Sequence, residues 1–317
     1  MTRVKLVNAI QSILKLYALK VLLIRGATLI LSMCLLLSVN FFLDGEQADN
    51  VFLSLSYTQS LVTLYVFGYD KAIWRSSIEN RASLYNSWFS FAILLMVVLL
   101  LIGFFIDRVP ETILAFVISV LFLRSWEDQA ENRLLRSTMV FTGLIPTLFL
   151  ILVMGFYFIN LPYNVVFLLV GLTLLGVLYF SKLFEGFMLD FEGIFSSLSN
   201  NLYFVVPTFL ISISSYLLLE HYSEIKEGLV YQYSGIIRLL AGIRVFTFVF
   251  NRLTINKEAN ALIRRYFVLT ILTISAFYVL FLVQMQDFIL EILGLSVHDS
   301  RLLLIGSGLV IVEYLGT

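Results

Sequence analysis

The sequence is poor in the residues that build soluble enzymes and disulfide-bonded domains. Its one cysteine, Cys34, lies in an apolar run, which excludes a disulfide framework and a cysteine-based metal site. Charged residues make up 13% of the chain, whereas soluble domains carry roughly 25%. The two histidines, His221 and His298, fall in predicted outer loops, where we interpret them as solvated side chains.

Motifs for catalysis are also missing. The chain has no GxSxG, CxxC, HExxH or phosphate-loop pattern, and no soluble nucleotide-binding domain. Lys plus Arg equals Asp plus Glu at 21 each, so net charge gives no reason to expect a nucleic-acid partner. We therefore predict a protein that is not an enzyme, has no metal and no cofactor, and functions in transport.

Apolar residues dominate what is present. The chain of 317 residues is 60% hydrophobic and 15% aromatic, which predicts an all-α, polytopic membrane helix bundle. The first apolar window is too long for a signal-peptide core, and the fourth spans only about 22 Å. About ten spans are visible, over residues 21–43, 51–68, 88–106, 112–126, 138–159, 163–181, 202–219, 229–250, 266–283 and 302–317.

The basic residues orient these spans. With the N-terminus cytoplasmic, Arg108, Lys226 and Arg301 are the basic residues of the outer loops, and most of the other Lys and Arg residues fall in inner segments. This asymmetry follows the positive-inside rule. Omitting the short fourth span would invert everything after it and export the basic segment 251–265.

A repeated layout predicts two pseudo-symmetric lobes. Acidic outer turns begin at Asp44 and at Glu220, and a basic inner segment follows each hairpin. We predict a six-helix lobe over 1–190 and an incomplete lobe of about four helices over 191–317. The inner segment 182–201 would be the linker between the lobes, and we expect it to lie at the membrane interface, as we do for 69–87.

Arginines inside predicted spans are the candidate binding residues. Arg238 lies near the middle of span 229–250, too deep to reach the interface easily, with Gly235 and Gly242 on the same helix face. The glycines fit either close helix packing or an open wall that admits a ligand. A cationic cavity suits an anionic ligand, and guanidinium groups pair well with phosphate.

Three other arginines fall within spans but nearer the interface. For Arg25, in the first span, binding and snorkelling to the interface are balanced alternatives. Snorkelling is the favoured interpretation of Arg244 and Arg124. Spans one to nine contain no Asp or Glu, and Glu313 in the tenth is the single candidate, so we expect no buried acid to serve ion coupling.

Three segments resemble a known family. VFGYDKAIWRSSIEN (66–80), VVPTFLISISSYLLL (205–219) and GLVYQYSGIIRLLAGIRVF (228–246) are similar to bacterial polysaccharide flippases of the O-antigen type, in the multidrug/oligosaccharidyl-lipid/polysaccharide exporter superfamily. The family usually has twelve or more spans, so a chain that stops in its tenth is expected to be C-terminally truncated.

The resemblance implies alternating access and a multi-pass protein of the cell inner membrane. Its cargo would be an undecaprenyl-pyrophosphate-linked oligosaccharide, an O-antigen or related surface polysaccharide unit used in lipopolysaccharide biosynthesis. Arg25, Arg238 and Arg244 stand at the matching places for diphosphate binding. The implied partners are this lipid-linked cargo and the bilayer, with a polysaccharide polymerase and a chain-length regulator as further candidates.

Two other functions remain open. One is a cation-coupled multidrug exporter of the same superfamily, against which the missing buried acid counts. The other is an O-antigen polymerase or another membrane glycosyltransferase, which usually has a larger outer loop than 284–301.

Overall fold

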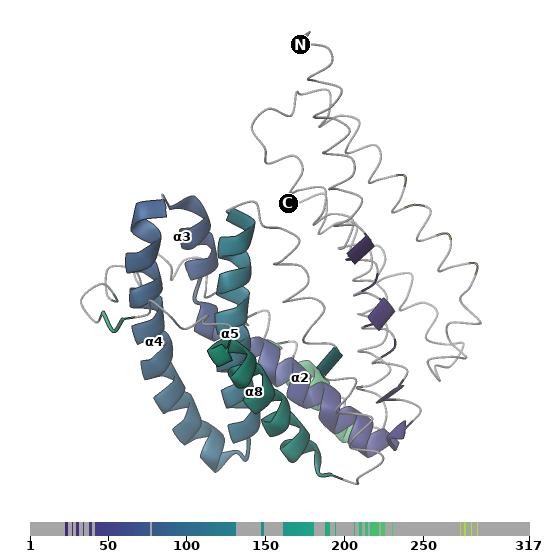
Figure 1. The fold of residues 1–317 in the computed structure, drawn as a ribbon. Coiled ribbons are helices and arrows are strands. Elements are labelled where there is room, and N and C mark those ends of the chain that lie inside the picture. Colours follow the sequence, from purple (N-terminus) through teal and green to yellow (C-terminus); the bar gives the residue numbers. More distant parts are fainter. Residues whose placement is uncertain are drawn as a thin grey trace. The chain divides into compact units, whose positions relative to one another are not determined.

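Five helices in the described part of the chain can be followed in the computed structural model (Figure 1). The structure describes residues 42–76, 78–130, 161–180, 188–190 and 216–221, with single residues or short groups between 23 and 39, at 147–148, between 194 and 230 and between 273 and 284. These described residues are helical or lie in turns and connections, and none of them is in a strand. The all-α prediction is confirmed for this part.

The chain divides into two compact units. Residues 42–230 form one, and residues 1–41 together with 231–317 form the other. The five helices belong to the first unit, which continues past the predicted lobe boundary at residue 190. The division into lobes at that residue stays a prediction.

Helix α2 (Gly45–Val66) begins in the predicted acidic turn. The Asp44 side chain accepts a hydrogen bond from the Gln47 backbone N–H at 2.8 Å, and Glu46 lies in the first turn, where carboxylates are favourable. The helix ends where Phe67 and Gly68 adopt left-handed backbone angles, with φ values of 44° and 71°. The predicted span 51–68 is therefore the larger part of a helix that starts six residues earlier.

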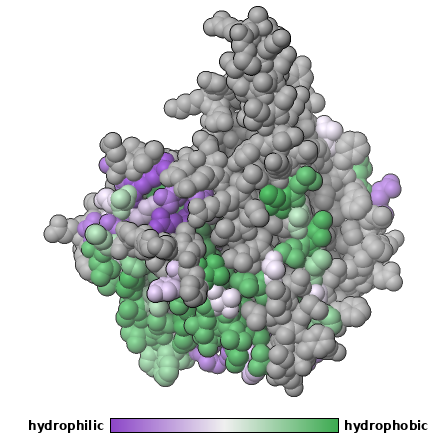
Figure 2. Space-filling view, in the orientation of Figure 1, coloured by the Kyte–Doolittle hydropathy of each residue, from purple (hydrophilic) through white to green (hydrophobic). Residues whose placement is uncertain are grey.

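The predicted inner segment 69–87 contains a short helix and the start of a long one. Helix α3 (Tyr69–Arg75) buries Tyr69 and Ile73 completely, and α4 (Ile78–Phe105) follows after a break at Ser76. The predicted span 88–106 coincides with the apolar part of α4. Its side chains are exposed along one face, up to 84% for Phe105, and Figure 2 shows this apolar surface over α4.

A tight turn joins α4 to α5 (Val109–Ala130). Asp107 adopts a left-handed conformation with φ of 54°, and the Arg108 N–H donates to the Gly103 carbonyl at 2.7 Å. The two helices approach closely there, since a Cβ added to Gly103 would lie 3.1 Å from Thr112 Oγ1. The weak fourth span, predicted as 112–126, is a helix of 22 residues, about 33 Å long.

Helix α5 is the centre of the described unit. It contacts α2, α3, α4 and α8 (Tyr163–Phe180), as Figure 1 shows. Its residues Leu114 to Val120 are buried. Within the apolar part of each helix, 67% is buried in α5 against 28% in α4. By length and composition, α4 and α5 are the described helices that could cross a membrane, over Asn80–Phe105 and Val109–Asp128, and Tyr163–Tyr179 is a shorter apolar helix.

Candidate functional site

The predicted diphosphate-binding residues cannot be placed. Arg25, Arg238 and Arg244 all lie outside the described residues, as does Glu313. Their role stays a prediction from the sequence.

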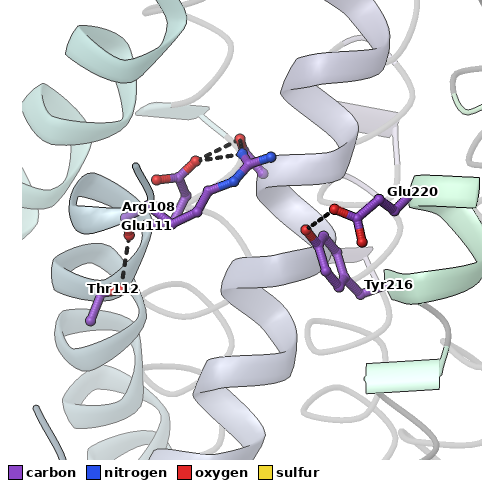
Figure 3. Close-up of polar contacts among 6 residues, drawn as sticks. Arg108, Glu111, Thr112, Tyr216 and Glu220 are labelled. Carbon is purple, nitrogen blue, oxygen red and sulfur yellow. Dashed lines mark hydrogen bonds and ion pairs between the residues drawn. The ribbon is translucent and has the colours of Figure 1, made fainter. Parts of the chain in front are cut away.

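Within the described part, charge is concentrated where the first turn of α5 meets α2. The Arg108 guanidinium contacts the Glu111 carboxylate, with Nη1 3.0 Å from Oε1, and also donates to Ser54 Oγ at 2.7 Å. Ser54 in turn donates to the same Glu111 oxygen at 2.7 Å. The three side chains therefore form a closed triangle that ties α2 to the start of α5 (Figure 3).

Local sequence explains how Arg108 and Glu111 meet. The turn before α5 ends at Arg108, and the helix opens with Val109, Pro110 and Glu111, so the two charges stand three residues apart at a helix start. The Thr112 hydroxyl donates to the Arg108 carbonyl at 2.9 Å and holds the turn in place. The geometry is thus fixed by the N-terminus of α5 itself, and Ser54 completes it from α2.

Burial makes this triangle energetically important. The Glu111 side chain is completely buried, and the Arg108 side chain is 17% exposed. Burial lowers the pKa of Arg108, but the hydrogen bond and the negative charge of Glu111 raise it by more, so its pKa lies above the ordinary value. Within the described part, the second Glu111 oxygen, Oε2, has no hydrogen-bond partner. The triangle is therefore a charged pair with one carboxylate oxygen left unsatisfied.

Aromatic residues extend the triangle to a third segment. Arg108 lies over the Tyr57 ring, 6.0 Å from its centroid, and the Tyr57 ring contacts Tyr216 at 5.2 Å with the planes tilted by 58°. The Tyr216 hydroxyl donates to Glu220 Oε1 at 3.0 Å. Figure 3 shows Tyr216 and Glu220 on a helical segment of their own, across α2 from Arg108. We call these residues, Ser54, Tyr57, Arg108, Glu111, Tyr216 and Glu220, the outer cluster, after the side to which charge bias assigns them.

A second set of contacts lies at the other ends of the same helices. Arg124 pairs with Glu127 at 2.8 Å and lies over the Tyr85 ring, 4.8 Å from its centroid. Its side chain is 19% exposed, so this arginine is paired and stacked near the end of α5. Snorkelling, the interpretation of Arg124 favoured by the sequence, stays a prediction, and the structure adds Glu127 and Tyr85 as its partners.

The predicted linker is attached to α4 at this same end. The Met188 N–H donates to Asn86 Oδ1 at 2.8 Å, the Asp190 N–H donates to Ser90 Oγ at 2.6 Å, and Ser87 donates to Asp190 Oδ2 at 3.3 Å. Residues 188–190 are not helical. Asn86 and Ser90 on α4 therefore accept hydrogen bonds from the backbone of the linker, and Ser87 donates to the Asp190 side chain.

The expectation of no buried acid was wrong. Glu111 is completely buried, and Asp49 and Asp128 are also buried, at 4% and 8% exposure. The predicted span 112–126 begins just after Glu111 because it was placed on apolar residues alone, whereas α5 begins three residues earlier, at Val109. The useful signal was the oppositely charged pair beside Pro110 at a helix start.

The described residues contain no group of three or more His, Cys, Asp and Glu side chains that could hold a metal ion. Cys34 is exposed. Comparison of the chain with protein-family models, with curated proteins and with solved structures found no match.

Proposed function

We propose that the chain is a flippase of the bacterial inner membrane. It moves an undecaprenyl-pyrophosphate-linked oligosaccharide between leaflets by alternating access of two lobes, built from about ten visible spans. The single observation that carries the proposal is Arg238, a cation near the middle of a predicted span, where charge is retained for function. The three family-like segments and the charge bias of the loops support it.

The described helices are compatible with this role. The exposed apolar face of α4 suits contact with acyl chains, and α5 is shielded by its neighbours. In the proposed mechanism, Arg25 and Arg238 bind the diphosphate in the central cavity, with Arg244 nearer the cytoplasm, while the prenyl tail stays in lipid.

The test measures surface glycan in a deletion strain that carries the full-length gene. Arg238→Ala should lower export roughly ten- to hundredfold, the range for losing one charge-assisted hydrogen bond, and Arg238→Lys should retain part of it. Arg252→Ala, in a predicted inner segment, is the matched control and should export normally. Normal export by Arg238→Ala would overturn the assigned role.

The leaflet in which cargo accumulates separates flipping from polymerisation. A deletion strain of a flippase should hold lipid-linked repeat units in the inner leaflet. Accumulation in the outer leaflet would instead indicate the polymerase.

A second candidate function is a cation-coupled drug exporter, because Glu111 supplies the buried carboxylate that such a protein needs. Its test is drug susceptibility. If deletion and Glu111→Gln both sensitise cells to cationic drugs while surface glycan is unchanged, this function replaces the first.

A further inference from the structure

The outer cluster joins two parts of the chain that the sequence assigns to different lobes. Tyr57 and Arg108 belong to the predicted lobe 1–190, and Tyr216 and Glu220 belong to 191–317. Across this boundary the Tyr57 and Tyr216 rings contact each other, with their centroids 5.2 Å apart. Both tyrosines are buried, at 7% and 8% exposure, as is Leu219 at 5%. The two predicted lobes are therefore in contact at the outer cluster.

The side-chain hydrogen bonds on each side are made within that side. Arg108 pairs with Glu111 and Ser54, and the Tyr216 hydroxyl is donated to Glu220. Separating the two rings breaks none of these bonds. It exposes two tyrosine rings, which tolerate water better than aliphatic side chains because each carries a hydroxyl group.

The strength of the contacts decides where the two predicted lobes would separate. The triangle of Ser54, Arg108 and Glu111 is a buried, hydrogen-bonded ion pair, which resists separation. A tilted aromatic pair is a weaker contact that can form and break reversibly. The triangle therefore joins α2 to α5, and the ring contact is the weaker of these two contacts.

We propose that Tyr57 and Tyr216 form the outer gate of the transporter, closed in this structure. The gate opens when the segment that carries Tyr216 and Glu220 moves away from α2, while the triangle stays intact. This inference rests on the proposed function, because a flippase that works by alternating access must open toward the side that receives the cargo.

Cross-linking tests the gate directly. The chain has one cysteine, so Cys34→Ser gives a background in which Tyr57→Cys and Tyr216→Cys can be joined by an oxidant or a short bismaleimide in membrane vesicles. We expect the cross-link to form and to reduce glycan export to the level of the deletion strain, with reductant restoring export after oxidation. Normal export by the fully cross-linked protein would overturn the gate.

A matched pair controls for cross-linking itself. Tyr65 and Phe116 contact each other at 5.8 Å, and both lie on helices that the triangle joins. In the same background, the Tyr65→Cys, Phe116→Cys pair should cross-link without loss of export. If this pair blocks export as completely as the gate pair, the gate has no special role.

A labelling measurement tests whether the gate opens, without any cargo. Leu219→Cys is a buried reporter three residues from Tyr216, on the same face of the segment. Its labelling by a membrane-impermeant maleimide should rise roughly two- to tenfold in Tyr57→Ala, the population shift expected from losing one aromatic contact. Tyr57→Phe, which keeps the ring, should leave the rate unchanged, and so should Phe116→Ala.

Equal labelling of the Leu219→Cys reporter in Tyr57→Ala and Tyr57→Phe would overturn the gate, even if the chain is a flippase. Conversely, normal glycan export in a deletion strain would overturn the flippase and leave the labelling result standing. The two failures are therefore distinguishable.

Discussion

The Trp88 indole N–H donates a hydrogen bond to the Tyr65 carbonyl across two helices, with Nε1 2.9 Å from the oxygen. Helix α2 ends at Val66, so the Tyr65 carbonyl belongs to the last turn, where carbonyl groups lack an intrahelical donor. Trp88 is completely buried and supplies that donor from α4. The end of α2 is thus fixed by a residue 23 positions later in the chain.

Trp88→Phe should destabilise the protein by about 1–3 kcal/mol, because it leaves a buried carbonyl unsatisfied while keeping an aromatic ring. Thermal unfolding of the purified protein in detergent measures the loss. Tyr85→Phe is the comparison, since it removes the hydrogen bond from the Tyr85 hydroxyl to the Leu123 carbonyl at 3.2 Å. Leu123 lies within α5, where its carbonyl also accepts a helical bond, so Tyr85→Phe should cost less. An equal or greater cost would contradict the capping role.

Glu111→Gln should destabilise the protein by about 3 kcal/mol, because it removes the charge that compensates Arg108 in a mostly buried site. The double variant with Arg108→Gln should recover much of this loss, since no uncompensated charge remains. A double-mutant cycle on the unfolding free energy measures the coupling. Additive effects of the two single variants would show that the pair is not energetically coupled.

Gly103→Ala should destabilise the protein by about 1–3 kcal/mol through overpacking. Its Cβ would lie 3.1 Å from Thr112 Oγ1 and 3.3 Å from the Arg108 carbonyl oxygen, and the latter is backbone that cannot rotate away. Gly176→Ala is the matched control, because no heavy atom lies within 4 Å of the added Cβ. It should stabilise α8 by about 0.5–1 kcal/mol. Similar melting temperatures for the two variants would contradict the close approach of α4 and α5.

Asp107→Gly should stabilise the turn between α4 and α5 by about 0.5–1 kcal/mol, because glycine adopts a φ of 54° without steric cost. Phe67 also has a positive φ, of 44°, but its ring is buried and lies 4.8 Å from the Phe91 ring. Phe67→Gly should therefore destabilise by about 2 kcal/mol, since lost packing outweighs relieved strain. Melting temperatures that shift in the same direction for both variants would contradict this assignment.

The positions of the helices were predictable because hydropathy is a local property of the sequence. The spans at 51–68, 88–106, 112–126 and 163–181 each fall within or nearly coincide with a described helix. Their ends were less predictable, because hydropathy marks only the apolar part of a helix, while the helix itself continues through flanking charged residues. Helix α5 shows the difference most clearly, as its first turn contains Glu111 and its last contains Glu127 and Asp128.

Long-range polar partners could not be predicted. Ser54 and Glu111 are 57 positions apart in the sequence, and Ser90 and Asp190 are 100 positions apart. Neither pairing has a local signal in a single sequence. Ser54, Arg108 and Tyr216 belong to one cluster, and the membrane side that charge bias assigns to it stays a prediction. The predicted binding arginines, Arg25, Arg238 and Arg244, depend on parts of the chain outside the described residues.

If the chain is the membrane protein proposed above, the short turn at Asp107 also bears on how it is inserted during synthesis. Helix α5 carries Glu111, Arg124, Glu127 and Asp128 and is unfavourable to insert alone, whereas α4 is apolar along its exposed face. A turn this short does not allow α4 and α5 to enter the bilayer separately. The translocon would therefore release them together as a helical hairpin, with α4 carrying its more polar partner into lipid and the Arg108–Glu111 pair neutralising charge at the leading tip.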